Sequence, residues 1–181
     1  IGRYKDRDRY LSVSLDIVDE MNQIVLEILS LSSVQELAGD KEWIQLDQVL
    51  EQILDQYKVL AQSRALTIDN QIPDKLVYMD PAILKLVLSN VISNAVKHSD
   101  AGGEIQLRLE EEGTHLAVEN TSQEMVETAE MPMTASRQKK EGGLGLFVVQ
   151  HLLDHEELAY QFDKTAMGLR FCMELPKDPQ E

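Results

Sequence analysis

The predicted strands of this chain are apolar on one face only, and this pattern limits the folds that it can adopt. In residues 104–111 apolar positions alternate with polar or charged ones, and residues 66–72, 114–120, 158–162 and 169–175 repeat the alternation. A strand of this period buries one face and leaves the other to water. Helices must therefore cover one side of the sheet, which predicts an α/β (α+β) two-layer sandwich with a mixed, mostly antiparallel sheet.

Four other stretches have helical spacing. Residues 47–63 and 144–154 carry apolar side chains three and four apart, and residues 80–98 open with an Asp-Pro pair, an N-cap followed by proline. Residues 10–37 carry two adjacent apolar stripes, wider than one partner helix needs. We expect a long N-terminal bundle helix whose hairpin mate lies outside this chain, or which dimerises. The alternative is that it packs on the rest of the domain.

Composition narrows the class of protein. The chain has 181 residues, 43% of them hydrophobic, and a net charge of −15, which excludes a disordered tail and disfavours nucleic acid as a partner. No run approaches the roughly 20 apolar residues that span a bilayer. The single Cys172 fits a reducing compartment. Because the chain opens on Ile1 and not on methionine, we expect a fragment of a longer protein.

Two asparagines on the helix over residues 80–98 are candidate ligand-binding groups. At roughly 100° per residue, Asn94 lies about 40° from Asn90, and Lys97 lies about 20° to the other side. All three border the apolar face. They could be structural amides that cap neighbouring loops, but two amides four residues apart beside a lysine favour a ligand-facing edge. A side-chain carbonyl there can coordinate Mg²⁺, which takes oxygen ligands.

A glycine-rich turn supplies a candidate phosphate site. Gly142, Gly143 and Gly145 stand at a helix start, where glycines let the backbone approach a phosphate and free N–H groups point at it. Glycines precede many helices, so the turn alone is a weak signal. A long polar stretch that ends in Lys139 and Lys140 precedes it and is typical of a functional loop.

Asn120 is a candidate base-binding residue. It shares a strand face with Leu116 and Val118, so its side chain should project under the helices, where a purine could lie. Its amide oxygen could accept a hydrogen bond from an exocyclic amine. The alternative is a turn-forming asparagine at a strand end.

In this order the three elements resemble the catalytic domain of sensor histidine kinases of two-component systems. Residues 90–98 resemble the N box of that family, residues 143–146 resemble its G2 box, and residues 118–121 stand where its G1 box should be. The resemblance covers nearly the whole chain. It implies the Bergerat (GHKL) ATP-binding fold, shared with gyrase and MutL-like ATPases.

The resemblance also implies roles for individual residues. Asn94 would hold Mg²⁺, Asn90 and Lys97 would contact phosphates, and these three would form the catalytic set. Residues 122–141 would form the ATP lid. The ATPase relatives carry a glutamate general base where Asn90 stands, and an amide cannot take up a proton, which favours transfer to a protein side chain over hydrolysis. The implied ATP-binding residues are Asn90, Asn94, Lys97, His98, Asn120, Lys140, Gly142, Gly143, Leu144, Gly145 and Leu146.

The same resemblance divides the chain. Residues 1–40 would be the second helix of an incomplete dimerisation and phosphoacceptor hairpin, and residues 41–181 the ATP-binding catalytic domain. No histidine here has the His-Glu-x-x-x-Pro context of the family's acceptor, so we expect the acceptor upstream of Ile1. His151 and His155, four residues apart, could instead be a metal pair, which we favour less. The implied partners are a response regulator and a second copy in a homodimer, and the implied location is the cytoplasmic side of a membrane-anchored sensor.

The G1 region departs from the family pattern. Asn120 replaces the usual aspartate, and Ser122 and Glu124 replace glycines; Glu141 replaces the first glycine of the G2 box. These changes predict weaker nucleotide affinity. The alternatives to a kinase domain are a Bergerat-fold ATPase or serine kinase, and a catalytically weakened dimerisation or regulator-binding module.

Overall fold

A computed structural model of the chain describes residues 39–122 and 143–177. By its contacts the chain divides into two units, Ile1–Ala38 and Gly39–Glu181, and all described residues belong to the second. The bundle helix expected over residues 10–37 lies outside the described residues, as does the expected lid apart from Ser122. Within the part of the chain that the structure describes, no helix is long and apolar enough to cross a membrane.

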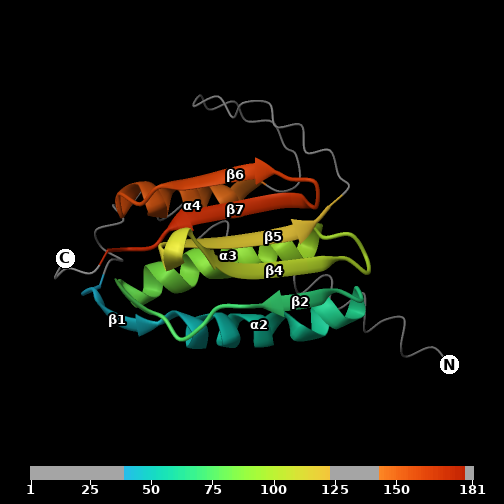
Figure 1. The fold of residues 1–181 in the computed structure, drawn as a ribbon, viewed down its shortest axis with the longest axis horizontal. Helices are drawn as coiled ribbons and strands as arrows, with labels where there is room; N and C mark the ends of the chain where they lie inside the picture. Colours follow the sequence, from blue (N-terminus) through green and yellow to red (C-terminus); the bar gives the residue numbers. More distant parts are fainter. Residues whose placement is uncertain (1–38, 123–142, 178–181) are drawn as a thin grey trace. The chain divides into compact units, whose positions relative to one another are not determined.

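The described unit contains both strands and helices (Figure 1). Its elements in chain order are β1 (Glu42–Gln45), α2 (Leu46–Ser63), β2 (Thr67–Asn70), β3 (Leu76–Met79), α3 (Pro81–His98), β4 (Glu104–Glu110), the 3-10 turn η2 (Glu111–Gly113), β5 (His115–Thr121), α4 (Gly143–His155), β6 (Tyr160–Lys164) and β7 (Gly168–Glu174).

The main sheet has five strands in the order β2-β4-β5-β7-β6. Strand β2 runs parallel to β4, and every other neighbouring pair in this sheet is antiparallel. Helices α3 and α4 lie behind this sheet in Figure 1, and α3 packs against α2, α4 and β5. The mixed, mostly antiparallel sheet with helices on one face confirms the two-layer sandwich predicted from one-sided alternation.

The core lies between this sheet and the helices. On the sheet, alternate residues of the strands turn to the helices because successive side chains point to opposite faces. The buried apolar residues of β4, β5 and β7 on this face are Ile105, Leu107, Leu116, Val118, Phe171 and Met173. Helix α3 contributes buried residues along its whole length, from Ile83 to Val96, which makes it the central helix of the unit.

Asp80 fixes where α3 begins. This residue is 1% exposed, and its carboxylate accepts hydrogen bonds from the backbone nitrogens of Ala82 at 2.7 Å and Ile83 at 3.2 Å. These bonds satisfy N–H groups that a helix start leaves unpaired. The other carboxylate oxygen accepts from the backbone nitrogen of Gly39. The predicted Asp-Pro start of this helix is confirmed.

A second, two-stranded sheet was not predicted. Strands β1 and β3 pair antiparallel, with Trp43 opposite Tyr78 and their rings 5.4 Å apart. Each strand has only four residues. A run of this length holds too few alternations to be distinguished from a loop by sequence pattern.

Candidate functional site

Asn90 of α3 meets the first turn of α4. Its Nδ2 donates a hydrogen bond to the carbonyl oxygen of Leu86 at 2.8 Å, which fixes the orientation of the amide. A Cβ atom added to Gly145 would stand 3.0 Å from Asn90 Oδ1 and 3.8 Å from its Cγ. The glycine therefore allows a backbone approach that a larger residue would obstruct. Two motifs 55 positions apart in the sequence are in contact in the fold.

The start of α4 lies beside this amide and carries backbone N–H groups that have no partner within the helix. The helix begins at Gly143, and the first turn includes Leu144 and Gly145. The first four N–H groups of a helix have no partner within it, and the aligned peptide dipoles favour negative charge there. This end of α4 therefore has the chemistry of a phosphate site. Leu146, which follows in the same turn, is half-buried.

The remaining candidates on α3 follow Asn90 along the helix. Asn94, Lys97 and His98 are all half-buried, so part of each residue is accessible from solution. Lysine and histidine also stand in the last turn, where positive charge complements the helix dipole. A purely structural role at the helix end is thus available to Lys97 and His98 alongside ligand binding.

Asn120 turns to the interior, as the strand alternation predicts. It is 5% exposed and lies directly opposite Ile105 of β4 and Leu169 of β7, on the helix-facing side of the sheet. Its Nδ2 is buried and has no hydrogen-bond partner among the described residues. Buried amides in proteins are normally paired, so this donor is a marked exception.

Two neighbouring segments hold the end of β5 in place. The backbone nitrogen of Asp100, just after α3, donates to the carbonyl oxygen of Thr121 at 2.9 Å. From the other side, a Cβ on Gly168 would stand only 2.2 Å from the carbonyl oxygen of Asn120 and 2.4 Å from the nitrogen of Ser122. Only glycine fits at this crossing. Sequence reasoning did not identify Gly168, since the approach depends on the register of β5 against β7.

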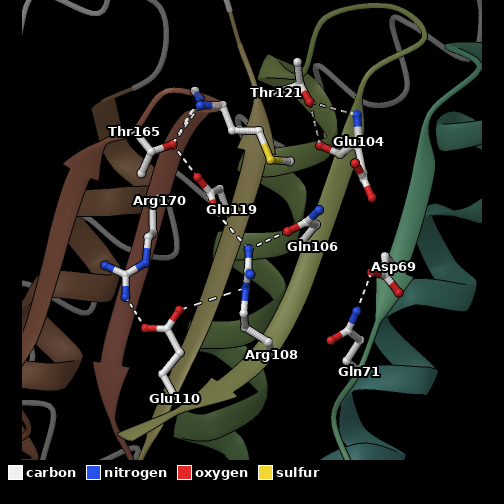
Figure 2. A network of polar contacts seen from close by, with 12 residues as sticks. Asp69, Gln71, Glu104, Gln106, Arg108, Glu110, Glu119, Thr121, Thr165 and Arg170 are labelled. Atoms are coloured by element: carbon white, nitrogen blue, oxygen red, sulfur yellow. Dashed lines mark hydrogen bonds and ion pairs between the residues drawn. The ribbon is translucent and has the colours of Figure 1, made fainter.

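The opposite face of the sheet carries a network of charges (Figure 2). Arg108 of β4 bonds Glu119 of β5 at 3.0 Å, and Glu119 also accepts a hydrogen bond from Thr165. Arg170 of β7 pairs with Glu110. Burial, the largest influence, lowers the pKa of Arg170, but the hydrogen bond and charge of Glu110, with further anionic neighbours, raise it above its ordinary value overall. These contacts connect neighbouring strands of the sheet, including β5, which carries Asn120.

Two expected site residues, Lys140 and Gly142, lie outside the described residues. His151 and His155 are exposed on α4, and the ring of His151 stacks on Phe147 with centroids 6.4 Å apart. Within residues 39–122 and 143–177, no group of three or more His, Cys, Asp or Glu residues could hold a metal ion. The structure therefore brings together Asn90 and the α4 start and adds no support for the histidine metal pair.

The chain is similar in sequence to known proteins. Residues 79–179 match the family described as histidine kinase-, DNA gyrase B- and HSP90-like ATPase. The sensor histidine protein kinase HK06 of Streptococcus pneumoniae is 32% identical over 97% of this chain, and the sensor protein VanSB of Enterococcus faecalis is 30% identical over 97%. The chain spans 41% and 42% of the length of these two relatives.

Solved structures share the fold. The histidine kinase ThkA, in a complex with the response regulator protein TrrA, aligns with a TM-score of 0.70 at 18% identity, covering 100% of this chain and 54% of ThkA. The cytoplasmic segment of histidine kinase QseC aligns with a TM-score of 0.65 at 19% identity, covering 89% of this chain and 95% of that segment.

The family match covers more than half of the chain and includes α3, β5 and α4, the elements that carry the candidate site. The chain belongs to the family of histidine kinase-, DNA gyrase B- and HSP90-like ATPases. Its fold is shared with the histidine kinases ThkA and QseC, including the structure of the ThkA catalytic domain.

Proposed function

We propose that this domain binds Mg·ATP beside α3 and the first turn of α4 and serves as the catalytic domain of a sensor histidine kinase. It would transfer the γ-phosphoryl group to a histidine outside this chain, from which a response-regulator aspartate receives it. The observation that carries the proposal is the contact between Asn90 and Gly145, because it joins a polar amide to a helix end suited to phosphate.

The residues present fit a nucleotide with a magnesium ion. Backbone N–H groups of Gly143, Leu144 and Gly145 would bind phosphate oxygens, together with Asn90 and Lys97. Asn94 would offer its carbonyl oxygen to Mg²⁺, which would neutralise phosphate charge during transfer. Asn120 would face the purine, His98 and Leu146 would line the site, and Lys140 and Gly142 would complete it from outside the described residues.

Asn90 favours transfer over hydrolysis. An amide has no basic site that could take a proton from water at neutral pH, so this position cannot act as a general base. Phosphoryl transfer depends mainly on positioning and charge neutralisation, which amides, N–H groups and a lysine can supply. The named relatives HK06 and VanSB, a sensor kinase and a sensor protein, support the same reading.

The proposal extends to the rest of the chain. Residues 1–40 would supply the second helix of a dimerisation hairpin, residues 41–181 the catalytic domain, and residues 122–141 the ATP lid. The full protein would be a homodimeric, membrane-anchored sensor with this part on the cytoplasmic side. The complex of ThkA with TrrA supports a response regulator as the partner.

A longer protein that includes the segment before Ile1 tests this proposal. With γ-labelled ATP and Mg²⁺ it should acquire acid-labile, base-stable phosphate, as expected of phosphohistidine. Asn94→Ala should abolish labelling, while Asn70→Ala, an exposed asparagine on β2, should leave it unchanged. Steady phosphate release with no labelled protein would establish an ATPase instead. If the protein is not labelled and no phosphate is released, a regulator-binding module is favoured.

A further inference from the structure

The turn between β6 and β7 is held by one hydroxyl group, that of Thr165. Its Oγ1 accepts hydrogen bonds from the backbone nitrogens of Met167 at 3.1 Å and Gly168 at 3.2 Å. The same hydroxyl donates a hydrogen bond to the carboxylate of Glu119 (Figure 2). The backbone nitrogen of Thr165 also donates to the carbonyl oxygen of Gly168 at 2.9 Å, which closes the turn. A single side chain therefore fixes the shape of the turn and joins it to β5.

This turn lies against the end of β5, where Asn120 stands. The carbonyl oxygen of Met167 accepts a hydrogen bond from the backbone nitrogen of Ser122 at 3.3 Å. A Cβ atom on Gly168 would lie 2.2 Å from the carbonyl oxygen of Asn120. Because the two backbones cross too closely for any side chain, a change in the turn is passed to the backbone of Asn120.

Thr165 acts from the face of the sheet opposite to the Asn120 amide. Asn120 turns to the helices, whereas Glu119, its neighbour on β5 and the partner of Thr165, turns to the outer face. Arg108 also holds the Glu119 carboxylate, at 3.0 Å, so the hydroxyl bonds to a charged group that is itself fixed. Thr165 therefore lies outside the lining of the proposed nucleotide site and can affect a bound base only through β5.

We propose that Thr165 is a positioning residue for the nucleotide base, because its bond to Glu119 and its hold on the Gly168 crossing fix the backbone that carries Asn120. The inference rests on the proposed function, in which Asn120 faces the purine. It does not depend on which atoms of the base the amide contacts. A binding group must be held within about 0.5 Å of its productive position, so loss of this support should weaken the contact with the base.

Titration calorimetry of the full chain with Mg·ATP tests the role of the hydroxyl. Thr165→Val keeps the shape of the side chain without the hydroxyl and should raise the dissociation constant about three- to tenfold. Thr165→Ser keeps the hydroxyl and should bind within about twofold of the unaltered chain. Thr114→Val removes a hydroxyl just before the other end of β5, where it bonds the carbonyl oxygen of Glu111, and should leave the constant unchanged. A serine variant as weak as the valine variant would show that the hydroxyl does not position the amide.

A double-variant cycle shows whether the effect passes through Asn120. In an Asn120→Ala background, Thr165→Val should change the dissociation constant by less than about twofold, because the amide that the hydroxyl positions is gone. The full rise in that background would refute the positioning role.

Hydrogen exchange of the unaltered chain tests the same coupling without substitutions. Coupling between two sites is reciprocal, so a bound base must in turn stabilise the β6–β7 turn. Saturating Mg·ATP should slow exchange of the Gly168 amide, which bonds Thr165, about threefold or more beyond its effect on the Leu175 amide, which bonds Thr114. Equal slowing at the two amides would refute the proposal.

The outcomes separate this inference from the proposed function. If the unaltered chain and a folded Thr165→Val variant bind Mg·ATP equally well, the positioning role is refuted and the ATP site stands. If the unaltered chain does not bind Mg·ATP at millimolar concentration, the proposed function fails, and this inference fails with it. The exchange measurement decides the matter if Thr165→Val does not fold or if Asn120→Ala no longer binds nucleotide.

Discussion

The side-chain oxygen of Asn90 lies 3.0 Å from the position that a Cβ atom would occupy on Gly145. This distance is shorter than ordinary van der Waals contact, so a side chain at residue 145 would require the Asn90 amide to shift by a few tenths of an ångström. The amide is also held from its own helix by the bond to Leu86. The orientation of Asn90 is therefore coupled to the backbone at the start of α4.

Gly145→Ala tests this coupling. Alanine favours a helix over glycine by about 1 kcal/mol, so the substitution should stabilise α4 wherever space allows. Against Asn90 the added methyl group should instead cost about 1–3 kcal/mol of overpacking. In an Asn90→Ala background the obstruction is gone, and the same change should stabilise the protein. Urea unfolding of the two single variants and the double variant measures the coupling energy. Purely additive effects would contradict the contact.

The same substitution should weaken nucleotide binding. Displacement of the amide and of the α4 start moves proposed phosphate contacts. Loss of one hydrogen bond to a charged group, worth about 1.5–3 kcal/mol, would raise the dissociation constant for Mg·ATP by about tenfold or more. Titration calorimetry at a temperature where the variant remains folded measures it. A dissociation constant equal to that of the unaltered chain would place the phosphates elsewhere.

Asp80→Ala should destabilise the domain. The carboxylate caps α3 through Ala82 and Ile83 and also receives the backbone nitrogen of Gly39. Loss of an N-cap costs about 0.5–2 kcal/mol, and the buried donors left behind add to this cost. Denaturant unfolding should show a lower midpoint. Asp74→Ala, at an exposed position, is the matched control and should have little effect. Equal midpoints for the two variants would show that the cap does not contribute to stability.

The local parts of the fold were predictable from sequence, and the long-range contacts were not. The Asp80-Pro81 start of α3 and the interior orientation of Asn120 follow from neighbouring residues alone, through capping chemistry and strand parity. The pairing of Trp43 with Tyr78 and the approach of Gly168 to Asn120 depend on strand register between distant segments. Periodicity contains no information about register across such separations.

For the charged residues, too, the local pattern was predictable from sequence and the long-range contacts were not. Arg108 and Glu119 alternate with buried apolar residues, so sequence places them on the outer face of the sheet, where charges are usually solvated. Glu119 is nevertheless only 9% exposed, and it accepts hydrogen bonds from Arg108 and Thr165. Contacts made by the loop between β6 and β7 account for part of this burial. No local pattern indicates that contact.

Arg108→Ala should therefore cost more than the loss of an ordinary surface ion pair. It leaves a mostly buried Glu119 carboxylate with one partner fewer, which is worth about 1–3 kcal/mol. Lys58→Ala removes the exposed pair with Asp55, whose side chains are 65% and 70% exposed, and should change stability by less than about 0.5 kcal/mol. Urea unfolding in low and high salt compares the two. Similar small losses would show that the network contributes nothing beyond solvated charges.

Cys172 should make the stability of the domain sensitive to alkaline pH. Burial of the thiol, only 8% exposed, raises its pKa above the ordinary value of 9.0; Arg170 opposes this shift, and Glu110, Glu111 and Asp163 reinforce it. Because the folded pKa lies above that of the unfolded chain, the folded state holds the proton more tightly. The stabilisation is complete below pH 9.0 and is lost as the pH rises through the folded pKa.

Cys172→Ala removes the contribution of the thiol to stability. It should therefore flatten the decline of the unfolding free energy as the pH rises above 9.0. Tyr160 separates the two alkaline effects, because burial, with the hydrogen bond and charge of Asp154, raises its pKa from 10.0, so its contribution is lost only at higher pH. Tyr160→Phe should therefore leave the slope between pH 9 and pH 10 intact. A thiol reagent adds an independent readout, since the protonated, buried sulfur should react only at the rate of unfolding. Rapid labelling of the native protein at pH 8 would show that Cys172 is not shielded. An identical pH slope in the alanine variant would show that the thiol is not linked to stability.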